Sequence, residues 1–180
     1  MFEAKKRYGL CVLNYMVTSN HVHLLVVDSG EEVTARSIQL IAGRTGQDYN
    51  RRKGRKGAFW EDRYQATAVE ADAHLIRCLI YIDTNMVRAG VVANPREWSW
   101  CGYHEIQSPP QRYRIIDRRM LMSLVDITDS DELSAAHRGW VKDALGNVGA
   151  RRDSKWTESI AACPVKYASR FNWGWLVGTL

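Results

Sequence analysis

The sequence predicts an α+β fold, and three observations lead to this prediction. Residues 10–17 and 22–27 are largely apolar runs that contain valine and leucine side chains, and the polar residues 18–20 between them are typical of a β-hairpin turn. Residues 72–89 place apolar side chains at spacings of three and four, as an amphipathic helix does. The chain of 180 residues is 46% hydrophobic and 25% charged, which is typical of a globular protein with one good core.

The elements between the hairpin and this helix complete the predicted order. The hairpin strands are apolar on both faces, as expected of strands covered on both sides. A helix is predicted over residues 33–50 and a basic loop over residues 51–57. Aromatic and β-branched residues predict a strand over residues 59–69. The order strand, strand, helix, strand, helix resembles a ferredoxin-like α+β sandwich that lacks its first strand and most of its first helix.

The chain is predicted to have two parts. A Ser-Pro-Pro sequence at residues 108–110 is typical of a linker, and residues 115–125 and 132–145 have the periodicity of two amphipathic helices. We therefore expect an α+β domain over residues 1–107 and a small helical C-terminal extension over residues 108–180.

Charge and cysteine usage narrow the functional class. The net charge is +5, and residues 44–56 carry six basic residues against Asp48 alone, so the basic excess is local. Such a run either contacts a nucleic-acid backbone or forms a solvated loop. The four cysteines show no Cys-x-x-Cys pairing, and no apolar signal region follows the first charges, so we expect a cytoplasmic protein without a membrane span.

His21 and His23 are candidate metal ligands. Side chains alternate along a strand, so both imidazoles lie on one face and can reach one ion. A buried imidazole costs free energy unless its ring nitrogens find partners, and a divalent metal is such a partner. Because two ligands are fewer than a metal site usually has, a solvated pair of histidines stays open as an alternative.

Tyr81 and Asn85 form a second candidate pair. They stand four residues apart on the predicted helix, so a phenol lies next to a carboxamide that can ligate a hard cation. The alternative is a half-buried tyrosine beside a capping asparagine.

Four motifs carry a resemblance to a known family. They are NHVHLLV at residues 20–26, FWEDRY at 59–64, YIDTNMVRAG at 81–90 and WSWCGY at 98–103. In order and spacing they resemble the REP-associated tyrosine transposases, which are relatives of the single-tyrosine HUH transposases of insertion sequences. The resemblance covers most of residues 7–103, and residues 1–107 would then be an HUH transposase or nuclease domain.

The resemblance implies a chemistry for each candidate residue. His21 and His23 would be paired ligands of Mg²⁺ or Mn²⁺, and Asn85 would be the third ligand. Tyr81 would attack a phosphodiester of single-stranded DNA at a hairpin-forming repeat, and the 5′-phosphotyrosine would allow the strand to be nicked and rejoined. The protein would then be associated with the nucleoid. Relatives include dimers, so monomer and homodimer both stay open.

The DNA-binding surface would combine cations with exposed rings. Phe59, Trp60, Tyr64, Trp98 and Trp100 are candidate stacking platforms, although such aromatics are often core residues instead. Arg63 and Arg88 are candidates for phosphate contacts, and the alternative for both is a salt bridge on the protein surface. The candidate DNA-binding residues are Arg51, Arg52, Lys53, Arg55, Lys56, Trp60, Arg63 and Arg88.

The chain also departs from the family pattern. Met86 stands where the family usually has proline, and the strand and most of the helix expected before Arg7 are absent, so the chain is identified as N-terminally shortened. We therefore expect the His23 strand to have one open edge. Two further functions stay open: an inactive truncated remnant that only binds nucleic acid, and a metal-dependent hydrolase without a covalent step.

Overall fold

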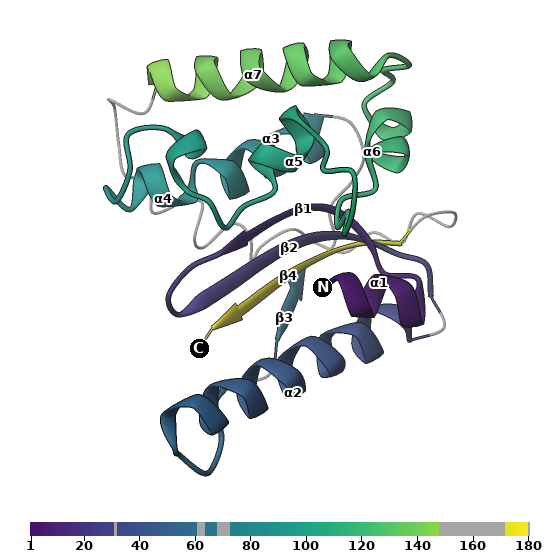
Figure 1. The fold of residues 1–180 in the computed structure, drawn as a ribbon. Helices are drawn as coiled ribbons and strands as arrows, with labels where there is room; N and C mark the ends of the chain where they lie inside the picture. The colour runs from purple at the N-terminus through teal and green to yellow at the C-terminus, as the bar shows by residue number, and fades with distance from the viewer. Residues whose placement is uncertain (31, 61–63, 68–72, 148–171, 180) are drawn as a thin grey trace.

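The computed structural model describes residues 1–30, 32–60, 64–67, 73–147 and 172–179, and these form an antiparallel sheet with helices on both faces (Figure 1). The α+β prediction is confirmed. The strands are β1 (Cys11–Val17), β2 (His21–Asp28), β3 (Gln65–Thr67) and β4 (Asn172–Thr179), in the order β1-β2-β4-β3. One face carries α1 (Phe2–Tyr8) and α2 (Val33–Lys53). The other carries α3 (Ala73–Asp83), α4 (Asn85–Arg88), the 3₁₀ turn η1 (Pro95–Glu97), α5 (Tyr103–Gln107), α6 (Arg118–Leu124) and α7 (Ser130–Asn147).

The predicted hairpin forms from β1 and β2. The strands pair antiparallel from Cys11↔Val27 to Val17↔Val22, and the Thr18 hydroxyl accepts the His21 N–H at 2.9 Å in the turn. A register shift between Val12 and Asn14 marks a β-bulge. The Asn14 amide beside this bulge reaches across to α3, where it donates to the Leu79 carbonyl at 3.2 Å.

Both faces of β2 are buried, because alternate side chains enter two separate cores. Leu25 and Val27 pack in a cluster with Leu79 of α3, whereas Leu24 and Val26 pack on the opposite face in a cluster with residues of α1 and α2. The prediction that the hairpin is covered on both sides is confirmed.

The prediction of an open edge on the His23 strand is wrong. β4 pairs antiparallel with β2 over its whole length, from His21↔Thr179 to Asp28↔Asn172, and separates β2 from β3. The C-terminal strand was not predicted because Gly174 and Gly178 interrupt the β-branched and aromatic residues of this stretch. A segment far away in the sequence therefore supplies the second neighbour of β2.

The region after the hairpin differs from the prediction in detail. α2 continues to Lys53, so the first three basic residues of the predicted loop form its last turn, and Gly54 ends the helix with φ +61°. Gly46 is accommodated inside α2 because Phe59 packs there, with its Cβ 3.2 Å from where a Cβ of residue 46 would be. A strand was predicted over residues 59–69, and among the described residues of this range only β3 (Gln65–Thr67) is a strand. Phe59 lies before it in a bend that packs against α2.

The predicted helix over residues 72–89 is divided in two. α3 ends at Asp83 and α4 begins at Asn85, and the Thr84 hydroxyl donates to the Ile80 carbonyl at 2.7 Å, an interaction that often bends helices. Gly90, with φ +71°, follows the last turn, as predicted. Asp72, the predicted cap, lies outside the described residues.

The C-terminal helices form close to their predicted positions, as α6 and α7. α7 packs on α3 and α5, and residue 116 bridges to Val12 of β1. The boundary after residue 107 stays a prediction. None of the helices in the described ranges is long and apolar enough to cross a membrane.

The aromatic motif at residues 98–103 lines the outer edge of β1. The Trp98 indole donates to the Val17 carbonyl at 2.9 Å, and the Gly102 N–H donates to the Tyr15 carbonyl at 2.8 Å. Gly102 lies so close to β1 that a Cβ there would overlap Oδ1 of Asn14 and come within 2.8 Å of Ile116. Only glycine fits this position without movement of its neighbours.

We predict that Gly102→Ala lowers the free energy of unfolding by about 1–3 kcal/mol, because overpacking forces the Asn14 side chain or the backbone to move. Gly139→Ala on α7 is the matched control, since nothing lies within 4 Å of its added methyl group. It should leave stability unchanged or raise it by up to about 1 kcal/mol. Urea unfolding of both variants measures the difference, and equal midpoints would contradict the close approach at Gly102.

Candidate active site

The two histidines of β2 lie on one face of the sheet, as predicted. Their rings are nearly parallel, with an interplanar angle of 6° and centroids 6.1 Å apart. His23 is 8% exposed, and His21, nearer the hairpin turn, is more open. The face is the one that α3 and α4 cover, because Leu25 and Val27 of the same alternating set pack in the cluster that contains α3.

Asn85 brings α4 into contact with β2. Its Nδ2 lies 3.3 Å from Nε2 of His23, although the two residues are 62 positions apart in the sequence. In this arrangement the amide donates to an unprotonated Nε2, and His23 Nδ1 is buried with no hydrogen-bond partner in the described structure. Nδ1 then carries the proton of the neutral ring, and a buried N–H without an acceptor is costly.

The environment of His23 favours the neutral imidazole. Burial lowers its pKa from 6.5 to about 4, and the nearby charges of His21 and Arg88 contribute in the same direction. A neutral imidazole has the free lone pair that a metal ligand requires. Within the described ranges no three His, Cys, Asp or Glu side chains gather, and the polar side chain that lies against His23 is the Asn85 amide.

Tyr81 lies one turn before Asn85, at the C-terminal end of α3. It is half-buried and packs at the margin of the core cluster on this face. The guanidinium of Arg88 lies over its ring, with Cζ 3.6 Å from the ring centroid. Arg88 also donates through Nη2 to the Tyr81 carbonyl at 3.2 Å. The structure thus places Tyr81 at the end of α3 and Asn85 and Arg88 on the adjoining α4, where Arg88 contacts Tyr81 and Asn85 contacts His23.

A buried polar network supports this segment, and its members were not predicted. Asp83, between Tyr81 and Asn85, has no solvent exposure. One of its carboxylate oxygens accepts from Nε2 of His137 at 2.7 Å, and the other accepts from the Asn14 amide at 3.0 Å. The helical spacing in the sequence indicates that Asp83 is buried, because it follows Leu79 by four positions and so belongs to the apolar stripe of α3.

The network continues from His137 to the surface of α7. The Gln107 amide lies 2.6 Å from Nδ1 of His137, and Arg138 donates to Oε1 of Gln107 at 2.7 Å. These distances are consistent with a single direction of donation, in which the Gln107 amide donates to Nδ1 and Nε2–H donates to Asp83. α7 is therefore connected to the end of α3 that carries Tyr81.

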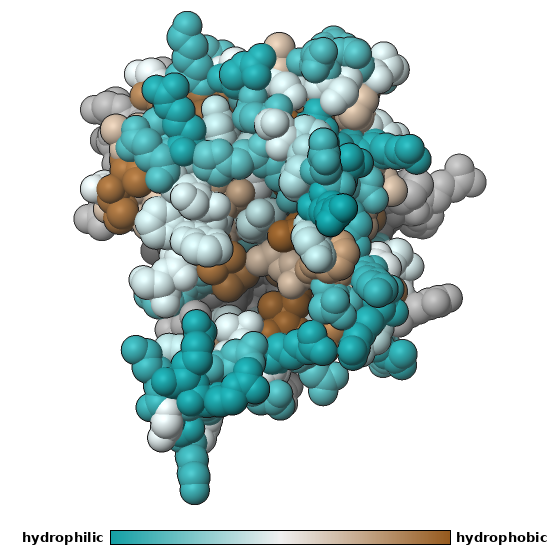
Figure 2. Space-filling model, in the orientation of Figure 1, coloured by the Kyte–Doolittle hydropathy of each residue, from teal (hydrophilic) through white to brown (hydrophobic). Residues whose placement is uncertain are grey.

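The predicted basic surface lies at the C-terminal end of α2. In Figure 1 this end projects from the molecule on the same side as the β1–β2 turn and α4, and Figure 2 shows it as a hydrophilic projection. One of its cations, Arg51, pairs with Asp48 at 2.6 Å. Arg63 lies outside the described residues. The exposed basic residues here are Arg51, Arg52, Lys53, Arg55 and Lys56.

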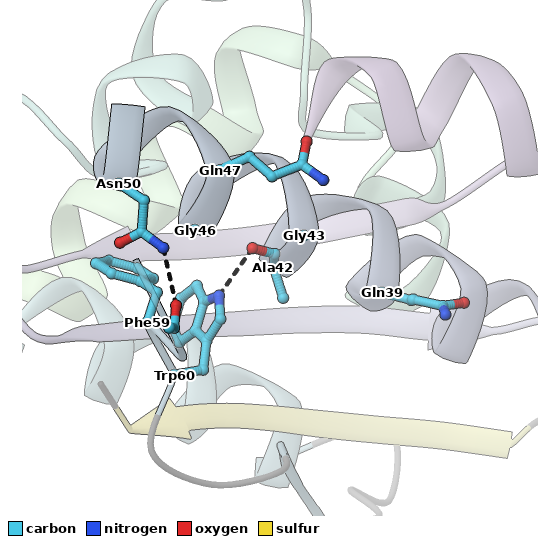
Figure 3. A pocket seen from close by; sticks show the side chains of 9 residues that line it. Gln39, Ala42, Gly43, Gly46, Gln47, Asn50, Phe59 and Trp60 are labelled. Atoms are coloured by element: carbon cyan, nitrogen blue, oxygen red, sulfur yellow. Dashed lines mark hydrogen bonds between the residues drawn. The ribbon is translucent and has the colours of Figure 1, made fainter. Parts of the chain in front are cut away.

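The aromatic candidates separate into two groups. Trp60 is half-buried, and its indole donates to the Ala42 carbonyl at 2.9 Å; with Phe59 it lines a hollow of about 440 Å³ beside α2 (Figure 3). Trp98 is also half-buried. Tyr64 and Trp100 are 41% and 69% exposed, so these two rings are accessible for stacking.

The fold and this site together bring a pair of histidines on a strand close to an amide on the facing helix α4, with a tyrosine on the adjoining α3 and a basic projection at the end of α2. The model of the family described as "Transposase IS200 like" matches residues 1–85. The matched stretch includes the two histidines, Tyr81 and Asn85. Searches of curated proteins and of solved structures gave no match.

The lowered pKa of His23 predicts a pH-dependent stability of the metal-free protein. Between pH 6.5 and about 4 the unfolded chain binds a proton that the folded His23 does not, so the stability falls as the pH falls through this window. The loss is about 3 kcal/mol.

His23→Gln should remove this part of the pH dependence, whereas His74→Gln, at an exposed position of α3, should keep it. Urea unfolding at pH 7 and pH 4.5 in the presence of a chelator measures the effect. Equal pH dependence in the parent and His23→Gln proteins would contradict the burial of a neutral His23.

Proposed function

We propose that the chain is a metal-dependent tyrosine transposase of the REP-associated type, with an HUH nuclease fold, that nicks and rejoins single-stranded DNA at hairpin-forming repeats. The observation that carries the proposal is the approach of Asn85 to His23 at 3.3 Å, because it joins the His-x-His strand to the helical segment that carries Tyr81. The family match over residues 1–85 supports the transposase part of this proposal.

The residues present fit a divalent cation. His21, His23 and Asn85 would hold Mg²⁺ or Mn²⁺ through two neutral imidazoles and, after rotation of the amide, the Asn85 oxygen. Three protein ligands leave positions open for phosphate oxygens, and the ion would supply Lewis-acid polarisation of the scissile phosphate. The feature of this chain that most favours a cation is its donor set, two nearly parallel imidazoles on one face of β2 with a carboxamide against Nε2 of His23.

The covalent step belongs to Tyr81. Its phenolic oxygen forms a bond to the phosphorus while the bond from phosphorus to the 3′ oxygen breaks, and the phenol loses its proton to solvent as the departing 3′ oxygen gains one. The 5′ phosphate stays on Tyr81. Attack by a 3′ hydroxyl reverses the exchange and rejoins the strand without an external energy source. The buried support of α3 through Asp83 would hold Tyr81 in place for an in-line attack.

The basic end of α2 would bind the DNA backbone, and Trp100 and Tyr64 would stack on unpaired bases. The half-buried position of Trp60 and its hydrogen bond to Ala42 instead favour a structural role against α2.

We predict that the protein, incubated with Mn²⁺ and hairpin-bearing single-stranded DNA, forms an adduct that survives denaturing electrophoresis. Tyr81→Phe should abolish the adduct because it removes only the nucleophilic oxygen. Tyr113→Phe is the matched control, since this ring is 72% exposed on the loop before α6. Nicking by Tyr81→Phe at the parental rate would contradict the covalent mechanism and favour a metal-dependent hydrolase that uses water.

The basic projection should determine DNA affinity rather than cleavage. Neutralising Arg51, Arg52, Lys53, Arg55 and Lys56 should reduce the slope of log affinity against log salt by up to about one unit for each phosphate that the variant no longer binds. Five other exposed cations provide a control of equal charge: Lys6, Arg36, Arg112, Arg119 and Lys142. Fluorescence anisotropy over a range of salt concentrations measures both variants. An equal slope for the two would show that the α2 projection does not bind DNA.

A further inference from the structure

Arg88 touches both the Tyr81 ring and the Tyr81 backbone. It is the last residue of α4, and its guanidinium carbon lies 3.6 Å from the centroid of the Tyr81 ring. The same side chain donates from Nη2 to the Tyr81 carbonyl at 3.2 Å. One group therefore holds both the face of the ring and the main chain that carries it.

The local geometry explains why an arginine at this position reaches Tyr81. Long helical side chains point toward the helix N-terminus, so a residue seven positions later can extend back across two turns. The helix is interrupted at Thr84 between the two residues, and the Arg88 side chain spans that interruption. A planar guanidinium lies flat on an aromatic face and still donates to a nearby carbonyl, whereas the ammonium group of lysine is a compact point charge without that planar contact.

We propose that Arg88 is a positioning residue for the Tyr81 side chain: by stacking on the ring and bonding to its backbone, it fixes the orientation of the phenol for attack on DNA. The proposal rests on the proposed function, in which Tyr81 is the nucleophile. It differs from the role predicted from sequence, in which Arg88 contacts a DNA phosphate.

The two roles have different kinetic consequences. A guanidinium stacked on Tyr81 affects how often the phenol has the reactive orientation, so its removal slows the covalent step at saturating DNA. An arginine that binds a DNA phosphate contributes to affinity, so its removal weakens DNA binding and reduces the salt dependence of the affinity. The lower affinity is then overcome at saturating DNA, where the rate is that of the parent. Rate and affinity, measured separately, therefore distinguish positioning from phosphate binding.

The experiment compares Arg88→Gln and Arg88→Lys with Arg119→Gln, which removes the same charge from an exposed position on α6. Single-turnover adduct formation at saturating hairpin DNA and Mn²⁺ should slow by roughly 10- to 100-fold in both Arg88 variants. The dissociation constant for DNA should change by less than about threefold in Arg88→Lys, which keeps the charge. Arg119→Gln should react like the parent.

A spectroscopic measurement tests the stacking without catalysis. In the DNA-free and metal-free protein, the side-chain protons of Arg88 should be shifted upfield in the NMR spectrum by the Tyr81 ring. The shift should persist in Tyr81→Phe and disappear in Tyr81→Leu. Equal chemical shifts of the Arg88 side-chain protons in the parent and in Tyr81→Leu would overturn the stacked arrangement.

Three kinetic results would overturn the inference. One is a parental rate at saturating DNA in the Arg88 variants, and another is full recovery of the rate by lysine, which would show that charge alone acts. The third is a parent protein that forms no Tyr81-dependent adduct, which removes the proposed function as well. Because the first two require an adduct in the parent, failure of the inference is distinguishable from failure of the proposed function.

Discussion

The structure depends on a buried carboxylate. Asp83 has no solvent exposure and lies at the end of α3, where it accepts hydrogen bonds from His137 of α7 and Asn14 of β1. Removal of one partner from this buried group leaves an unsatisfied hydrogen-bonding atom and typically costs about 1–3 kcal/mol. Asp83 therefore holds the sheet, α3 and α7 in one arrangement, and Tyr81 and Asn85 lie on either side of it.

The second constraint is the complete pairing of β2. This strand has a neighbour on each edge and a core on each face, so the position of His23 is determined by its backbone and by the packing of Leu25 beside it. β4 occupies the edge that the sequence was expected to leave open. The hypothesis of an inactive remnant assumed that an open edge on β2 makes the sheet fold poorly. In the described part of the structure this edge is paired with β4, so that reason for poor folding is absent.

The sequence predicted those features that depend on local pattern. Alternation placed His21 and His23 on one face, and helical spacing placed Tyr81 near Asn85, because both periods follow from backbone geometry. The pairing of Asp83 with His137 could not be predicted in this way, since the partners are 54 positions apart and no local pattern joins them. The break at Thr84 was also missed, because it comes from a side chain that bonds to the preceding turn.

The proposed chemistry requires that this buried arrangement present Tyr81 as a nucleophile toward DNA. Mass spectrometry of the protein after reaction with hairpin DNA, nuclease digestion and proteolysis identifies the residue that carries the nucleotide. We expect a residual nucleotide attached through its 5′ phosphate to the peptide that contains Tyr81, on the tyrosine itself. A nucleotide attached to another residue, or cleaved DNA with unmodified Tyr81 under single-turnover conditions, would contradict the proposed role of Tyr81.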